Sequence, residues 1–209
     1  MKIELPVDVK KIIDRLNGSG AEAYAVGGCI RDSILGREPE DWDITTSARP
    51  KEIKQIFERT VDTGIKHGTV TVLIKHRLSE MDPSKYELRP YEVTTYRVDG
   101  EYKDGRHPEN VSFTPSLTED LRRRDFTINA MAYNDEHGLV DEFQGLSDME
   151  KKVIRCVGDP DERFTEDALR LLRAVRFSAQ LGFDIEEGTR SAMIRHADNL
   201  RYVSKERIQ

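Results

Sequence analysis

Segments with helical spacing alternate with strand-like segments through the first 95 residues. This alternation limits the possible folds more than any other feature of the sequence. The strand-like segment AEAYAV runs into two glycines, after which CIRDSIL has the pattern of a helix. A helix that starts at Pro50 and the strand-like segments TVTVLIK and YEVTTYR follow. A first helix is predicted over residues 7–17, because apolar residues recur there at helical spacing: Val9, Ile12, Ile13 and Leu16. This mixture predicts an α+β fold.

The segment PEDWDITT, residues 39–46, alternates acidic and apolar residues. In a strand, Asp41 and Asp43 would share one face with Cα atoms roughly 6.5 Å apart. Glu92 lies in the later strand-like segment YEVTTYR and would reach the same spot if the two strands were neighbours. Carboxylates gathered in this way suit Mg²⁺, which prefers oxygen ligands. The alternative is an acidic strand face that is merely solvated.

Gly27 and Gly28 lie between a predicted strand and a predicted helix. Such a turn leaves backbone N–H groups free at the start of the helix, where a phosphate binds well, and Arg31 adds a cation one turn later. The alternative is a tight turn that needs a positive φ. A phosphate site followed by paired acids predicts two-metal transfer of a nucleotide from a nucleoside triphosphate to a hydroxyl.

The chain changes character after Pro160, where helices are predicted throughout. We place a boundary near residue 147, between a mixed domain at 1–147 and a helical domain at 148–209. A long helix is predicted over residues 163–183, with an apolar stripe formed by Ala168, Leu171, Leu172, Val175 and Ala179. Four charged residues lie away from this stripe, namely Asp167, Arg170, Arg173 and Arg176.

These charges form either a solvated, ion-paired helix face or the border of a pocket. Phe177 and Leu181 fall on the charged side, which favours the pocket. Earlier in the chain, the spacing of Ser116 and Glu119 predicts a helix that leads through LRRRDFTINAMAY, and the polar stretch of residues 95–118 before it predicts a long loop. The last residues continue a helical pattern without a stop, so we expect a chain truncated before further domains.

Composition excludes several classes of protein. A net charge of −6 argues against a broad, non-specific nucleic-acid surface, although Lys and Arg gather locally. No apolar run approaches the ~18 residues of a membrane helix, and the N-terminus lacks a signal-peptide core, so a cytoplasmic protein is expected. Cys29 and Cys156 have no partner motif, which disfavours a zinc site or a disulfide framework.

Four segments together resemble the catalytic head and neck of class II tRNA nucleotidyltransferases, the CCA-adding enzymes, and of bacterial poly(A) polymerases. They are AVGGCIRDSILGREPEDWDITTSARP, DGEYKDGRHPENVSF, LRRRDFTINAMAY and RFTEDALRLLRAVRF. The resemblance implies a nucleotidyltransferase (DNA polymerase beta-like) head with a mixed sheet, followed by an all-helical neck. It also implies magnesium-dependent addition of CMP and AMP, from CTP and ATP, to the 3' end of tRNA. The alternatives are an A-adding enzyme or poly(A) polymerase and a non-catalytic nucleotide- or RNA-binding module.

The resemblance also assigns roles to individual residues. It makes Asp41 and Asp43 the ligands of catalytic Mg²⁺ and Glu92 a third acid. Asp167 and Arg170 would select the base of the incoming nucleotide, and residues 99–110 resemble the loop associated with adding the final A. Gly27, Gly28 and Arg31 would contact the phosphates of the nucleotide. Arg124 and Asp125 would serve nucleotide and ribose recognition with support from Asn129, and Arg173 and Arg176 would hold the nucleotide or brace the helix that carries Arg170.

Overall fold

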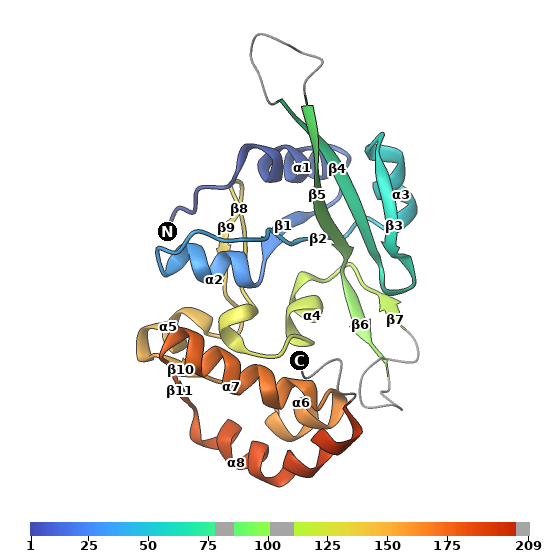
Figure 1. The fold of residues 1–209 in the computed structure, drawn as a ribbon. Helices are drawn as coiled ribbons and strands as arrows, with labels where there is room; N and C mark the ends of the chain where they lie inside the picture. The colour runs from blue at the N-terminus through green and yellow to red at the C-terminus, as the bar shows by residue number, and fades with distance from the viewer. Residues whose placement is uncertain (78–85, 101–110, 204–209) are drawn as a thin grey trace. The chain divides into compact units, whose positions relative to one another are not determined.

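The computed structural model describes residues 1–77, 86–100 and 111–203 (Figure 1). The chain forms two compact units, each assembled from separate stretches of sequence. The first unit contains Met1–Arg97, Phe113–Leu117 and Ala132–Val140, and the second contains Val98–Ser112, Thr118–Met131 and Asp141–Gln209. The predicted domain boundary at residue 147 stays a prediction.

A seven-stranded mixed sheet forms the centre of the first unit. Its strands in spatial order are β3 (Thr60–Gly64), β4 (Thr69–Arg77), β5 (Tyr86–Thr95), β2 (Ile44–Thr46), β1 (Ala23–Val26), β8 (Ala132–Asn134) and β9 (Gly138–Val140). Only β2 and β5 run parallel, and every other neighbouring pair is antiparallel. The ends of β4 and β5 extend beyond the other strands (Figure 1). The predicted α+β class with a mixed sheet is confirmed.

Three α-helices and a 3₁₀ turn complete the first unit: α1 (Val7–Gly18), α2 (Gly28–Ile34), α3 (Pro50–Ile56) and η1 (Ile65–His67). The predicted positions of the three helices are confirmed. The predicted apolar stripe of α1 is buried, and α1 packs on β1 and on α3. Burying such side chains stabilises the fold by about 1.5–3 kcal/mol each.

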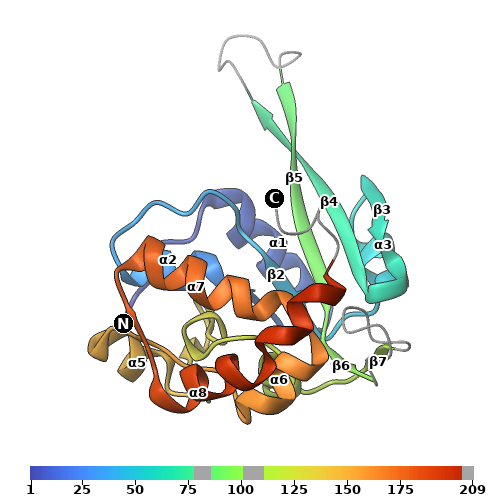
Figure 2. The same ribbon diagram turned by 60° about the horizontal axis from the view of Figure 1, so that its bottom comes forward.

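The second unit is mainly helical. Its helices are α4 (Leu117–Arg122), η2 (Thr127–Asn129), α5 (Gly145–Lys151), α6 (Pro160–Glu166), α7 (Leu169–Leu181), α8 (Glu187–His196) and η3 (Ala197–Tyr202). Helix α6 packs against both α7 and α8 (Figure 2). In the core, the rings of Phe126 and Phe177 pack edge to face, with their centres 5.9 Å apart. No helix in the described part of the chain is long and apolar enough to cross a membrane.

Several predicted elements differ from the structure. The predicted long loop contains two short paired strands, β6 (Arg97–Asp99) and β7 (Val111–Phe113). The helix predicted after Ser116 ends at Arg122 instead of continuing through the next apolar segment. After Pro160 the second unit also contains β11 (Asp184–Ile185), which pairs in parallel with β10 (Val153–Ile154). Pairing with distant segments therefore forms strands where a loop or a helix was predicted, and after α4 Phe126 pairs in the same way with Cys156.

The predicted helix of residues 163–183 is two helices, α6 and α7. Asp167 has an extended backbone (φ −141°, ψ 106°), which ends α6. The Asp167 carboxylate accepts a hydrogen bond from the backbone N–H of Leu169 at 2.9 Å, at the start of α7. An aspartate that bonds to nearby backbone in this way competes with helix continuation, which explains the break.

The buried face of α7 also differs from the predicted stripe. Arg170, Leu171, Ala174 and Phe177 are buried, whereas Val175 is 54% exposed. Compared with the predicted stripe, the buried face of α7 is rotated toward the arginines. Phe177 packs on Phe126 there, and the buried Arg170 guanidinium donates hydrogen bonds that are described below.

Candidate functional site

Asp41 and Asp43 lie in the segment that leads into β2, which begins only at Ile44. The prediction that both acids belong to the strand is therefore wrong. The Asp43 carbonyl accepts a hydrogen bond from the Val26 backbone N–H at 3.0 Å, which extends the pairing with β1 by one step. The pairing stops there because Gly27 has a φ of 86° and turns the chain away from the sheet. Both carboxylates are exposed.

Glu92 lies on β5, the parallel neighbour of β2, as its predicted place beside the acids requires. The register pairs Ile44 with Val93, so the preceding residues, Asp43 and Glu92, lie at the same level. Partial burial raises the pKa of the Glu92 carboxyl, and the negative charges of Asp43 and Asp41 raise it further. The three acids therefore interact electrostatically at one end of the β2–β5 pair.

These acids suit Mg²⁺ in their chemistry, because all their donors are carboxylate oxygens. A cation there would offset the like-charge repulsion that raises the pKa of Glu92. Within the described ranges, no three acidic, histidine or cysteine side chains are gathered closely enough to hold a metal ion together. Mg²⁺ is commonly held by only one or two carboxylates, with water and substrate phosphates completing its shell. Asp41 and Asp43 match that arrangement.

The glycine turn starts α2 directly after β1. Gly27 has φ 86° and ψ −130°, which only glycine adopts easily, so the backbone of this turn requires glycine here, while its contact with phosphate stays a prediction. A Cβ atom on Gly28 would lie 3.7 Å from the Arg31 guanidinium, an ordinary contact distance. The buried Arg31 folds back over this turn and pairs with the Asp32 carboxylate through two hydrogen bonds of 2.9 and 2.8 Å.

Asp125 is the centre of a polar cluster in the second unit. Its carboxylate accepts hydrogen bonds from the Phe126 backbone N–H at 2.8 Å, from Asn129 Nδ2 at 3.2 Å and from Arg173 Nε at 2.6 Å. Burial alone would raise the pKa of Asp125, but the Arg173 charge and these hydrogen bonds outweigh it and lower the pKa. The structure thus brings three of the predicted nucleotide-binding residues together.

The other predicted arginines lie close to this cluster in the sequence or on α7. The Arg124 guanidinium lies 3.6 Å from the buried Asp120 carboxylate. The guanidinium carbons of Arg173 and Arg176 lie 5.1 and 5.3 Å from the centre of the Phe177 ring. Cation–π contacts of this kind orient both side chains along the helix.

Arg170 is held by acceptors on three sides. Its guanidinium donates to Glu166 Oε2 at 2.6 Å, to the Arg163 carbonyl at 3.3 Å and to the Arg123 carbonyl at 3.1 Å. The predicted shared helix with Asp167 is wrong, because Asp167 precedes α7. The Asp167 backbone carbonyl nevertheless accepts from the Arg170 N–H at 3.0 Å, so the two residues remain neighbours.

Two acidic residues that the sequence reasoning missed organise these arginines. Glu166 binds both Arg170 and Arg163, each at 2.6 Å. Asp120, whose side chain is fully buried, accepts from Arg123 at 2.8 Å and pairs with Arg124. The signal that could have found them is the spacing of three or four residues between each acid and its arginines, which brings side chains together on a helix.

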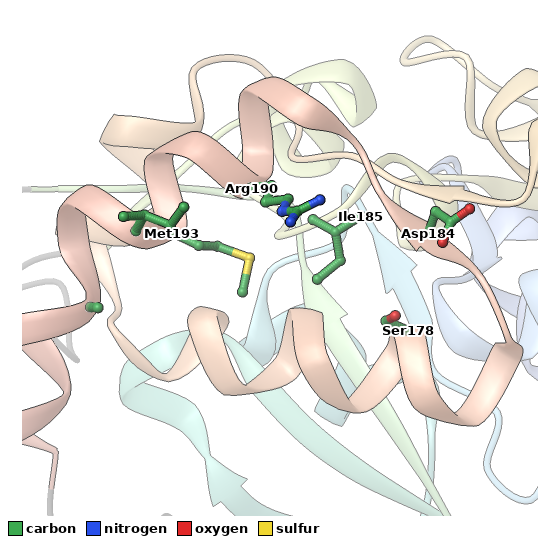
Figure 3. Close-up of a pocket in the computed structure, with 7 residues that line it drawn as sticks. Ser178, Asp184, Ile185, Arg190 and Met193 are labelled. Atoms are coloured by element: carbon green, nitrogen blue, oxygen red, sulfur yellow. The ribbon is translucent and has the colours of Figure 1, made fainter.

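A hollow of about 750 Å³ lies elsewhere in the second unit, between α7 and α8 (Figure 3). Figure 3 shows Ser178 on α7 facing Arg190 and Met193 on α8, with Ile185 of β11 nearby. The residues that line the hollow include none of the predicted site residues. Most of the predicted loop 99–110 lies outside the described residues, so its role stays a prediction.

Two family models match the chain. The model of the poly A polymerase head domain matches residues 23–155. A second model, described as a probable RNA and SrmB-binding site of polymerase A, matches residues 182–209.

Curated proteins and solved structures give the same relationship. A CCA-adding enzyme of Leuconostoc mesenteroides is 50% identical over 213 residues, which cover 100% of this chain and 50% of that protein. A crystal structure of the Bacillus stearothermophilus CCA-adding enzyme with CTP has a TM-score of 0.84 and 40% identity, and covers 99% of this chain and 47% of that one.

A tRNA nucleotidyltransferase complexed with a primer tRNA and an incoming ATP analog has a TM-score of 0.69 and 30% identity, over 94% of this chain and 53% of that one. The chain thus spans about half the length of these relatives. Because the head-domain model matches well over half of its residues, the chain belongs to the poly(A) polymerase head-domain family, the family of the class II CCA-adding enzymes.

Proposed function

We propose that this protein adds CMP and AMP, from CTP and ATP, to the 3' end of tRNA without a nucleic-acid template. The observation that carries the proposal is the grouping of Asp41, Asp43 and Glu92 at one end of the β2–β5 pair, where Asp43 pairs with Val26 beside the glycine turn. The relatives described as CCA-adding enzymes and the solved complexes with CTP and with tRNA support the choice of substrates.

In the proposed site, Asp41 and Asp43 would hold Mg²⁺. The bound ions would stabilise the attacking and leaving oxygens of an in-line displacement at the nucleotide phosphate. Glu92 is the candidate acceptor for the proton of the tRNA 3'-hydroxyl, because it lies level with Asp43 on the neighbouring strand β5. Gly27, Gly28 and Arg31 contact the triphosphate.

The second unit supplies the proposed recognition of the nucleotide. Arg124 and Asp125 recognise the nucleotide and its ribose, with Asn129 in support, since a carboxylate accepts hydrogen bonds from the ribose hydroxyls. Asp167 accepts and Arg170 donates, which matches the amino group and ring nitrogen shared by cytosine and adenine. Arg173 and Arg176 hold the nucleotide or brace α7. A cytoplasmic location stays a prediction.

The rival enzymatic function is A addition alone or poly(A) synthesis, which the name of the matching head-domain family keeps open. A non-catalytic binding module has less support, because a protein that only binds nucleotide has no need of three carboxylates that interact at one end of a strand pair.

The test offers the protein three tRNAs: one without the last three nucleotides, one without only the last A, and one complete. CCA addition requires CMP and AMP incorporation into the first, AMP into the second and none into the third. Extension of the complete tRNA by many A residues would instead identify a poly(A) polymerase, and AMP incorporation into the second tRNA alone would identify an A-adding enzyme.

The matched control replaces the proposed metal ligands. Asp41→Asn and Asp43→Asn should each lower incorporation by several orders of magnitude, since each removes a charge that the metal needs. Near-normal incorporation by both variants in Mg²⁺ would show that these acids are not the metal ligands.

A further inference from the structure

A second concentration of charge lies on the first unit, in a hollow of about 250 Å³. Its walls come from α1, from the segment after α3 and from β4. We call it the basic hollow and define it by its four cations, Lys11, Arg15, Arg59 and Lys75. The lining also contains Glu58, Phe57, Leu73 and Ile74, and none of the residues predicted for the nucleotide site.

The four cations lack carboxylate partners in the described part of the first unit. Arg15 instead donates to the Ile56 backbone carbonyl, and its guanidinium carbon lies 4.7 Å from the centre of the Phe57 ring. The Lys75 ammonium lies 4.8 Å from the centre of the Tyr86 ring. Neutral groups therefore position both side chains and leave their charge available to an outside anion.

This arrangement contrasts with other cations of the same unit. Lys10 pairs with Asp135, and Lys54 pairs with Asp62 at 2.8 Å. Among the described residues that line the basic hollow, there are four cations and one carboxylate, that of Glu58. Gathering like charges with so few counter-charges is unfavourable in the free protein, and the cluster occurs in a chain with a net charge of −6.

The chemistry of the hollow favours the phosphate backbone of RNA as its occupant. Lysine and arginine bind backbone phosphates without reading sequence. Tyr86, 40% exposed beside Lys75, offers a ring on which an unpaired base can stack. The small volume suits phosphate groups better than a folded protein segment.

We propose that the basic hollow is a contact site for the RNA phosphate backbone, and that within the proposed function this RNA is the tRNA. The inference rests on the proposed tRNA substrate, but it adds a binding surface that is separate from the nucleotide site.

The test measures tRNA binding by fluorescence anisotropy as a function of salt, between about 50 and 200 mM KCl. The probe is a tRNA without its last three nucleotides. The double variant Arg59→Gln/Lys75→Gln removes two cations of the hollow at exposed positions. The matched control, Lys51→Gln/Lys66→Gln, removes two exposed lysines that do not line it.

The logarithm of the tRNA-binding constant falls as the logarithm of the salt concentration rises, and each lost phosphate contact should make this slope shallower by about 0.7–0.9. The slope of the double variant should therefore be shallower than that of wild type by about 1.4–1.8, and its affinity for tRNA at low salt should fall. The control variant should keep the wild-type slope and affinity. Lys11→Gln should give about half of that loss and serves as a second variant.

Equal slopes in the double variant and the control, with tRNA binding and nucleotide incorporation intact, would overturn this inference and leave the proposed function standing. Failure of the wild-type protein both to bind tRNA and to incorporate nucleotide would overturn both. Calorimetry with inorganic pyrophosphate separates a small-anion site: pyrophosphate binding that is lost in the double variant while the tRNA slope is unchanged would overturn the RNA assignment.

Discussion

The Asp125–Arg173 pair gives the sharpest test of how the second unit holds its polar cluster. Asp125→Asn keeps the shape of the side chain but removes the charge that accepts from Arg173 Nε at 2.6 Å. The Asp125 side chain is 8% exposed and that of Arg173 is 36% exposed. Breaking a buried ion pair costs about 3–5 kcal/mol, but water can reach Arg173, so the loss should fall nearer the roughly 1.5–3 kcal/mol of a charged hydrogen bond.

The pH dependence of this loss follows from the lowered pKa of Asp125. A carboxyl whose folded-state pKa lies below its unfolded value stabilises the protein fully above the unfolded pKa, about 3.9. That contribution disappears as the pH falls through the lower folded-state pKa. Urea unfolding of wild type and Asp125→Asn should therefore differ most at neutral pH, and the difference should shrink below about pH 4.

The matched control is Asp198→Asn, which alters an exposed pair with Arg201 and should change the free energy of unfolding by less than about 1 kcal/mol. A difference between wild type and Asp125→Asn that stays constant from pH 7 to pH 3 would refute the assignment of this stability to the ionised carboxylate.

Three further predictions concern other parts of the molecule. Glu92→Gln should make the metal-free protein slightly more stable at pH values above the raised pKa of Glu92, because it removes a carboxylate whose ionisation is disfavoured by burial, Asp43 and Asp41. It should nevertheless lower nucleotide incorporation at least tenfold. Urea unfolding without metal and incorporation with Mg²⁺ check both effects, and a loss of stability with unchanged incorporation would contradict the prediction. Asp167→Ala and Arg170→Ala should each weaken selection of C and A over U and G by roughly tenfold or more. Asp167→Ala should also lower the free energy of unfolding by about 1 kcal/mol, because it removes the hydrogen bond to the Leu169 N–H. Incorporation of the four nucleotides and thermal unfolding measure these effects, and unchanged selectivity in both variants would refute the base-selecting role. Gly145→Ala should lower the free energy of unfolding by about 1–3 kcal/mol, since its Cβ atom would lie 2.5 Å from the Thr127 carbonyl oxygen. Thermal unfolding compares it with Gly138→Ala, where a Cβ atom has open space but the backbone φ is positive. The packing explanation fails if Gly145→Ala is as stable as wild type.

Local sequence determined much of the first unit. The apolar stripe of α1 and the proline that opens α3 predicted those helices, because each signal acts within a few residues. The strands β4 and β5 were predicted from their composition for the same reason. The segments that resemble the family's motifs were also sufficient to identify the family.

Contacts between distant residues decided what the sequence could not. The parallel pairing of β2 with β5 puts Asp43 level with Glu92, 49 positions later in the chain, and no local pattern contains that register. Asp125 likewise meets Arg173 across 48 positions. Even the break at Asp167 depends on a choice between continuing the helix and bonding to the Leu169 N–H, which helical spacing does not reveal.

The basic hollow most clearly separates what local sequence determines from what contacts between distant residues decide. The sequence contains Lys11, Arg15, Arg59 and Lys75 as unremarkable charges on three separate elements. Only the packing of α1 beside α3, and of β4 beside β3, brings these charges to one place. Sequence periodicity determines which face of an element is apolar, because that depends on neighbours along the chain. Which charged faces meet depends on how the elements pack, and the tertiary structure alone decided that.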